Sequence, residues 1–293
     1  MTVIGTGISW TNSTWGLATG CDKVSAGCDF CYAEELVDRM GTFGHAFNEV
    51  KLHLERLPHV RRFKPLPDGQ GGYNPHMVFV NSMSDFWHDA IPDSIVHEIL
   101  DVMEVHPGVV FQILTKRPIR ARKLLTARYG GRGIPNHIWI GVSAEDNRVA
   151  KRLDIMRTVK QRCGGGGVFF VSVEPIVGPT DQLDFADIDW IITGGESGPR
   201  ARTMERAWLM AVLDNASAPI WHKQSGTVRS HPNIDRVPQR YTKPADQFRW
   251  LRDNGWEVLP QEKGGATADK MTWRHLPPAY YALKQSMADL LTA

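Results

Sequence analysis

Three of the four cysteines in this chain lie within one short stretch, at Cys21, Cys28 and Cys31. Their spacing, C-x6-C-x2-C, lets a single loop deliver all three thiols to a common centre. Disulfides are a poor explanation, because three clustered thiols cannot all pair with one another and a chain of 293 residues can bury a core without cross-links. The stretch therefore indicates a metal ion, an iron–sulfur cluster or reactive thiols.

The spacing alone leaves these alternatives open. A [4Fe-4S] cluster held by three cysteines keeps one iron free for a small-molecule ligand. Structural zinc needs four protein ligands, usually as two pairs, and the sequence has no second C-x2-C, since Cys163 stands alone before a glycine run. Zinc completed by a histidine such as His53 is the second alternative, and buried or reactive thiols are the third.

The elements that must position the cysteines repeat along the chain. Six short apolar runs follow the cysteine stretch, each ending in polar residues: MVFV, VVFQIL, IWIGV, VFFVSV, DWIIT and APIW. Strands that are apolar on both faces and alternate with helices are typical of parallel sheets. With a short strand just before Cys21 they make about seven βα units, close to the eight of a full barrel.

The segments between the runs support this interpretation. One helical stripe, as on a crossover helix packed against a sheet, is formed by Ile95, Val96, Ile99, Leu100 and Met103. The run CGGGG at 163–167 predicts a turn. We therefore expect an α/β fold with a partial or near-complete (β/α) barrel over residues 1–226. Residues 227–293 form an extension expected to pack on the barrel or cap it.

Polar residues follow nearly every predicted strand. Because the carboxyl ends of parallel strands meet at one edge of the sheet, we expect these residues to line a cavity with the cysteines. They are Ser82, Ser84, Asp85, Thr115, Lys116, Arg117, Ser143, Glu145, Asp146, Glu174, Gly194, Gly195, Glu196, Ser197, His222, Lys223 and Gln224.

Composition narrows the function classes. The net charge of +2 creates no global field that demands nucleic acid, although HVRRFK and KRPIRARK are locally basic. No apolar run reaches the roughly 18 to 20 residues of a membrane span. The first residues, MTVIGTGISWTN, lack the basic-then-apolar order of a secretion signal, so we expect a cytoplasmic protein.

Several motifs together resemble a known family. They are ISWTNSTWGLATGCDKVSAGCDFCYAE, VNSMSDFWHD, ILTKRP, IGVSAED, VSVEPIVGP, IITGGESGPRAR and WHKQSG, between about residues 8 and 226. This set is similar to a radical-SAM-like three-cysteine family of phage and bacterial proteins, within the radical S-adenosylmethionine (SAM) superfamily. The gap between Cys21 and Cys28 is wider than the superfamily's usual one and is the norm in this longer family.

The resemblance implies a radical SAM enzyme. In such an enzyme Cys21, Cys28 and Cys31 ligate three irons of a [4Fe-4S] cluster, and SAM chelates the fourth. One electron then cleaves SAM to a 5′-deoxyadenosyl radical, which abstracts hydrogen from a substrate. The implied catalytic residues are Lys116, Glu174 and Glu196. The implied cofactor-binding residues are Phe30, Tyr32, Ser82, Ser84, Asp85, Ser143, Gly194 and Gly195.

The resemblance also implies partners. An electron donor such as flavodoxin or ferredoxin would reduce the cluster, and the phage association favours a nucleic-acid base or nucleotide as the substrate of modification or repair. Ten tryptophans available for stacking and a set of basic residues agree with this class: Arg61, Arg62, Lys64, Arg117, Arg120, Arg122 and Lys123. The competing interpretation is a non-catalytic zinc-binding module on the same barrel, which binds nucleic acid or protein.

Overall fold

The computed structural model describes residues 2–41, 44–197, 200–224, 258–260, 271–273 and 276–292. A ten-stranded sheet organises the chain, in the order β1-β2-β7-β8-β9-β10-β11-β12-β14-β13. Its strands are β1 (Thr2–Ile4), β2 (Ser13–Trp15), β7 (His76–Val80), β8 (Val109–Thr115), β9 (Ile134–Ser143), β10 (Gly166–Val173), β11 (Trp190–Gly194), β12 (Ile220–Gln224), β13 (Val258–Pro260) and β14 (Met271–Trp273).

The central part of this sheet is parallel. Strand β2 and strands β7 to β12 each run parallel to their neighbours, whereas β1, β13 and β14 are antiparallel additions at the two ends. The sheet curls into a half-barrel and does not close among the described residues, because β1 and β13 stay at opposite ends of the order. The predicted α/β partial barrel is confirmed.

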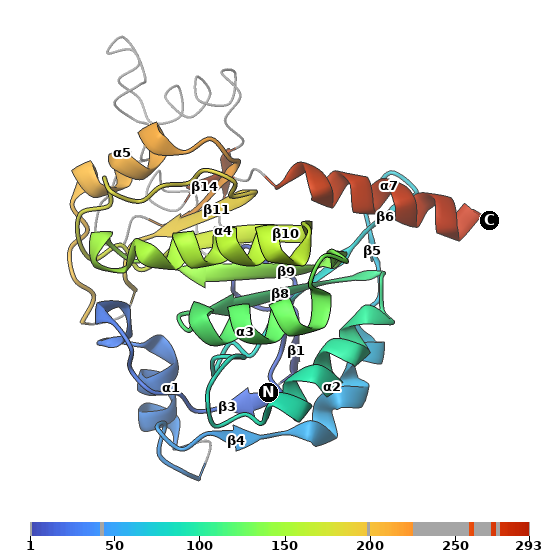
Figure 1. Cartoon of the computed structure of the whole chain (residues 1–293), viewed down its shortest axis with the longest axis horizontal. Coiled ribbons are helices and arrows are strands. Elements are labelled where there is room, and N and C mark those ends of the chain that lie inside the picture. The colour runs from blue at the N-terminus through green and yellow to red at the C-terminus, as the bar shows by residue number, and fades with distance from the viewer. Residues whose placement is uncertain are drawn as a thin grey trace.

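Helices cover the outer face of the sheet. Figure 1 shows α2, α3 and α4 side by side on this face, and their buried side chains share one core with the sheet. The predicted stripe lies on α2, where Val96, Ile99, Leu100 and Met103 are buried. The helices are α1 (Tyr32–Met40), α2 (Asp93–Glu104), α3 (Pro118–Tyr129), α4 (Lys151–Cys163), α5 (Arg206–Asn215) and α7 (Pro278–Thr292), with short 3-10 turns η1 (Ala26–Cys28), η2 (Leu54–Arg62) and η3 (Asn147–Val149).

The inner face changes character along each strand. On β10, Val168 and Phe170 point inward with the aromatic layer, whereas Ser172 lies one step nearer the carboxyl end and lines a cavity. Side chains alternate between the two faces of a strand, so this order follows directly from the sequence GGVFFVSVE. The inner face is therefore apolar at its floor and polar at its carboxyl rim.

A layer of aromatic side chains fills the floor. Trp139 and Trp190 meet edge to face with ring centroids 5.7 Å apart, and Trp190 meets Trp221 at 6.1 Å. Gly141 leaves room for this layer, because a Cβ there would lie 2.3 Å from the Phe170 ring. Tyr280 of α7 joins the same cluster. Part of the predicted 227–293 extension thus packs against the floor of the half-barrel.

Residues near the start of the chain cross the open side of the half-barrel. Trp10 packs into the aromatic layer at 4.7 Å from Phe79, and the indole N–H of Trp221 donates to Ser9 Oγ at 3.1 Å. This contact joins the segment before β2 to β12, near the other end of the sheet.

Three details differ from the sequence-based expectation. The first parallel strand is β2, and the two residues just before the cysteines form β3 (Ala18–Thr19), which pairs with β4 (Lys51–Leu52) in a separate ladder. A further pair is β5 (Leu66–Pro67) with β6 (Tyr73–Asn74). No helix follows β10 before β11, although every residue between them is described.

No helix in the described part is both long and apolar enough to span a membrane.

Candidate functional site

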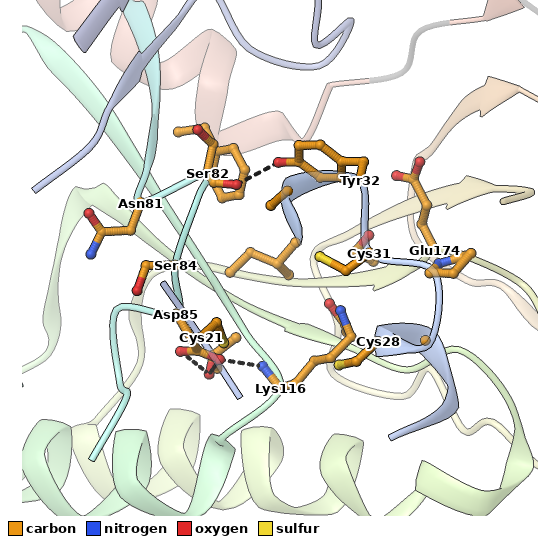
Figure 2. A pocket seen from close by; sticks show the side chains of 18 of the residues that line it. Cys21, Cys28, Cys31, Tyr32, Asn81, Ser82, Ser84, Asp85, Lys116 and Glu174 are labelled. Atoms are coloured by element: carbon orange, nitrogen blue, oxygen red, sulfur yellow. Dashed lines mark hydrogen bonds between the residues drawn. The ribbon is translucent and has the colours of Figure 1, made fainter. Parts of the chain in front are cut away.

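The cysteine loop, residues 20–31, lies over the carboxyl rim of the half-barrel. Cys28 ends the short turn η1, and Cys31 is the N-cap of α1. All three thiols are free and half-buried, and all three line a cavity of about 390 Å³. Figure 2 shows them around one space with Asp85, Lys116 and Glu174. The three cysteines and these polar residues at the strand ends therefore line one cavity, as the sequence predicted.

The backbone at Cys21 is fixed by close packing. Gly20 has φ +93°, and a Cβ at this position would lie 2.2 Å from the carbonyl oxygen of Glu49. The Cys21 amide donates to the Phe47 carbonyl at 2.8 Å, and Ser84 Oγ donates to the Gly20 carbonyl at 2.7 Å. Only glycine fits this left-handed, crowded position, so the residue before Cys21 is part of what places its thiol.

The thiol of Cys21 is not activated as a nucleophile. Burial raises the pKa of Cys21 to about 11, and the nearby Asp85 carboxylate adds to the shift. A reactive cysteine needs a lowered pKa, because the thiolate is the nucleophile. The alternative of a reactive thiol at Cys21 is therefore unsupported.

Asp85 joins the loops that follow β7 and β8. Its carboxylate accepts from Thr115 Oγ1 at 2.8 Å, from the Lys116 amide at 3.0 Å and from the Trp87 amide at 2.9 Å. The side chain is buried and lines the cavity. These three donors occupy much of its accepting capacity, so Asp85 first of all fixes the rim.

The other residues of this loop contribute backbone as well as side chains. Tyr32 donates its hydroxyl hydrogen to the Ser82 carbonyl at 2.6 Å, which ties the start of α1 to the loop after β7. Ser82 and Ser84 both line the cavity. The hydroxyl of Ser84 is used on the Gly20 carbonyl, so Ser84 positions the cysteine loop.

Two predicted residues on neighbouring strands face the middle of the cavity. The Lys116 side chain extends toward the cysteines in Figure 2, and no described carboxylate forms an ion pair with its ammonium. Ser143, at the end of β9, lines the cavity beside Ser172 of β10. A cation and two hydroxyl groups here suit an oxygen-rich ligand.

Glu174 forms the opposite wall. Its Oε1 accepts from Lys223 Nζ at 2.6 Å, and both residues line the cavity. Gly194 lies behind this pair, where a Cβ would be 3.2 Å from the Glu174 carboxyl group. Among the described side chains of the strand-end residues expected at the cavity, Glu145, Asp146 and His222 do not line it, and neither does Gly194. Its role is to leave space for Glu174.

Glu196 is held by an arginine. Its carboxylate accepts from the Arg202 backbone amide and guanidinium at 2.6 to 2.9 Å, and it is 4% exposed. These hydrogen bonds raise the pKa of Arg202 above its ordinary value. Glu196 and the adjacent Gly195 line the cavity, but the carboxylate is already engaged. The catalytic role implied for Glu196 stays a prediction, and its observed contacts hold Arg202.

The donor set fits a cluster better than a single ion. Among the described residues, no three His, Cys, Asp or Glu side chains converge closely enough to hold one metal ion. A [4Fe-4S] cluster needs no such convergence, because each thiolate binds a different iron. His53, the suggested fourth zinc ligand, has Nε2 2.9 Å from Thr19 Oγ1 and Nδ1 3.4 Å from Glu55. Both of its ring nitrogens are thus engaged outside the cavity.

Asn81 and Ser172 are two of the cavity residues that sequence reasoning missed. Asn81 directly follows β7 and accepts the amides of Leu17 and Ala18 at 2.7 and 3.0 Å, which holds the segment before the cysteines. Its φ of 58° is a conformation that asparagine tolerates better than most residues, so an asparagine directly after the predicted strand was the usable signal. Ser172 could have been found from its inward position two residues before Glu174.

Part of the predicted basic surface is paired with carboxylates. Arg120 pairs with Asp93 at 2.6 Å, Lys123 pairs with the same carboxylate at 3.3 Å, and Arg117 lies near Asp22. Arg61 and its neighbours in η2 are exposed but do not line the cavity. The expectation that the tryptophans are available for stacking is also wrong for six of the described ones, because they are buried. These are Trp10, Trp15, Trp87, Trp139, Trp190 and Trp221.

The sequence matches the family DUF5131, described as "Protein of unknown function", over residues 5–277. The chain belongs to this family. No curated protein matches it. Among solved structures, the DUF5131 chain is similar to "Spore photoproduct lyase complexed with dinucleoside spore photoproduct", with a TM-score of 0.45 and 13% identity over 97% of this chain and 74% of that one. All the cavity residues lie within the DUF5131 match.

Proposed function

We propose that this DUF5131 protein is a radical SAM enzyme. The observation that carries the proposal is the placement of three free thiols, from one loop, around a cavity at the carboxyl rim of a parallel half-barrel. Cys21, Cys28 and Cys31 would hold a [4Fe-4S] cluster. Such a cluster, when bound with SAM at its open iron, supplies the electron that cleaves SAM to methionine and a 5′-deoxyadenosyl radical.

The chain's own residues supply binding and orientation. The Lys116 ammonium lies near the cysteines and suits the SAM carboxylate, since the described residues provide it with no ion pair. The hydroxyls of Ser143 and Ser172 suit the ribose oxygens. Phe30 and Tyr32, on either side of Cys31, line the cavity with aromatic surface for the adenine ring.

Water exclusion falls to the floor of the half-barrel. Trp10 and Phe79 line the cavity from below and belong to the buried aromatic layer. A radical that abstracts hydrogen must be shielded from competing hydrogen donors, and a closed apolar floor provides this on one side. The ion pair of Glu174 with Lys223 faces the same space and is our candidate for substrate contact.

The substrate class and the electron donor rest on the resemblance. It implies a nucleic-acid base or nucleotide, and a small donor protein such as flavodoxin or ferredoxin. Two arginines of the basic runs are already engaged, since Arg120 pairs with Asp93 and Arg117 lies near Asp22, so these two give little support to the first. The division into residues 1–226 and 227–293 is also a proposal. Its boundary lies outside the described residues, while β13, β14 and α7 join the sheet and its floor.

Anaerobic reconstitution with iron and sulfide tests the proposal. We expect a brown protein with about four irons per chain that binds SAM and releases 5′-deoxyadenosine after reduction with dithionite. A protein that takes up one zinc per chain and no iron would instead be the zinc-binding module. Metal analysis and chromatography of the nucleoside distinguish the two directly.

A further inference from the structure

Two side chains, from the segments after β9 and β11, hold the backbone just before Cys28 and the side chain just after it. Ala26 and Gly27 precede this cysteine and Asp29 follows it. Arg202, beyond β11, contacts Ala26 and Asp29, and Glu145, beyond β9, contacts Gly27. The middle cysteine therefore sits in a clamp whose two arms, Arg202 and Glu145, follow the two strands that flank β10.

Arg202 makes a dense set of contacts for a residue that is not itself part of the cavity wall. Its Nη2 donates to the Ala26 carbonyl at 2.7 Å and its Nη1 to Asp29 Oδ2 at 3.1 Å. Its guanidinium also lies 5.1 Å from the centroid of the Phe30 ring. The buried carboxylate of Glu196 fixes the arginine through the backbone amide and two guanidinium nitrogens.

Glu145 forms the second arm from inside the protein. It is 0% exposed, its Oε2 accepts from Arg152 at 2.9 Å, and its Oε1 accepts from the Gly27 amide at 3.3 Å. A Cβ at residue 27 would lie 3.1 Å from the Glu145 carboxyl carbon, so glycine permits this approach. A buried charge held by an ion pair is a rigid anchor, because moving it would leave it unpaired.

We infer that Arg202 is a positioning residue for the cysteine loop, with Glu145 as its counterpart, and that together they hold Cys28 in place before any cluster is bound. The inference rests on the proposed function only in naming the bound group as an iron–sulfur cluster. Arg202 also places its guanidinium against Ala26 and Asp29, which flank the Cys28 position, and nearby charge is one of the factors that set cluster potentials.

The neighbouring Arg200 provides a matched control. It also lies over Phe30, at 5.0 Å, and forms an ion pair with Glu35 at 2.7 Å. Unlike Arg202, it donates its hydrogen bonds to Glu35 of α1, and among the described residues it does not contact the backbone of residues 26–29. Replacing either arginine removes one positive charge over the same ring, but only Arg202→Gln opens the clamp.

Hydrogen exchange of the metal-free full chain tests the positioning directly. We expect amides in residues 24–31 to exchange about tenfold faster in Arg202→Gln than in the wild type, and Arg200→Gln to remain within about twofold. If Arg202→Gln does not fold, Asp29→Asn, at a half-exposed site, must show a smaller increase in the same peptides. If the amides of residues 24–31 exchange at the wild-type rate in the variant that folds, Arg202→Gln or Asp29→Asn, the inference is overturned.

The reduction potential of the reconstituted protein is a second measurement, and it would not change if Arg202 only stabilised the fold. We expect the reduction potential of the bound cluster to fall in Arg202→Gln and to be restored in part by Arg202→Lys, which keeps the charge but not the planar fork. Iron retention after gel filtration should fall in the same order. If the wild type binds no iron, the proposed function fails, whereas the exchange experiment still decides the positioning of the loop.

Discussion

Each of the three cysteines is placed by a different device. Cys21 follows a glycine packed against the Glu49 carbonyl, Cys28 lies between the two arms of the clamp, and Cys31 caps α1. Because the devices are independent, the loss of one thiol should leave the other two in position. The role of each cysteine as a ligand can therefore be tested by replacing one cysteine at a time.

Replacing Cys28 separates a ligand from a structural thiol. We expect Cys28→Ala to lose the brown chromophore and all release of 5′-deoxyadenosine, while its circular dichroism matches that of the wild type, because the thiol is half-buried and free. Cys163→Ala is the control. Its fully buried thiol lies away from the cavity, so this change should cost about 1 kcal/mol of stability and no iron. A Cys28→Ala protein that still cleaves SAM refutes the ligand assignment.

Replacing Lys116 tests the proposed contact with the SAM carboxylate. Loss of one charged hydrogen bond in Lys116→Gln should weaken SAM binding about tenfold, measured by anaerobic titration calorimetry of the reconstituted protein. Lys123→Gln is the control, because its side chain is 73% exposed and pairs with Asp93. Equal affinities in the two variants would mean that Lys116 serves another ligand.

The cysteines and the polar strand ends were predictable from local sequence, because spacing and alternation depend on near neighbours. The roles of Asp85 and Glu196 were not. Asp85 accepts from Thr115, 30 positions away, and Arg202 reaches the Ala26 carbonyl across 176 positions. A single sequence shows that a carboxylate stands at a strand end, but only the fold shows which donor already occupies it.

At the scale of elements, the rim is held by contacts between successive loops. Asp85 connects the loop after β7 to the end of β8, and Ser84 connects the same loop to Gly20. The six apolar runs predicted the strands correctly because each is buried on both faces. The helix expected between β10 and β11 is absent from that described segment, where Val177 and Ile176 instead donate to backbone carbonyls of the rim.

Asp85→Asn tests whether this residue anchors the rim. The amide keeps the shape but replaces one acceptor with a donor, which leaves Thr115 or Lys116 without its partner. We expect the free energy of unfolding in urea to fall by about 2 kcal/mol. Asp89→Asn, whose side chain is 78% exposed, should change it by less than about 0.5 kcal/mol. Unchanged stability together with lost SAM binding would show that Asp85 contacts the cofactor directly.

At the scale of the molecule, the half-barrel depends on its aromatic floor. The layer draws on β7, β9, β10, β11 and β12, and α7 closes it with Tyr280. This use of the tryptophans explains why so aromatic a chain presents few of them for stacking in its described part. The sequence could not separate the floor from the outer core, because strands such as β7 and β11 are buried on both faces.

Two adjacent tyrosines on α7 provide a test of the floor. Tyr280 is 8% exposed and packs in the aromatic layer, whereas Tyr281 is 56% exposed. Tyr280→Ala should lower the free energy of unfolding by about 3 kcal/mol, because it leaves a cavity beneath the half-barrel. Tyr281→Ala should change it by less than about 0.5 kcal/mol. Equal effects in a thermal or urea unfolding experiment would show that α7 is not part of the core.

The hydrogen bond from Trp221 to Ser9 joins residues 212 positions apart. During synthesis, the segment that carries Ser9 and Trp10 leaves the ribosome long before β12 exists, so it cannot take its final place until almost the whole half-barrel has been made. Contacts of such long sequence separation slow folding. A nascent chain that stops before Trp221 therefore lacks the partner of Ser9 and leaves part of the aromatic layer incomplete, and transiently exposed apolar surface of this kind favours aggregation.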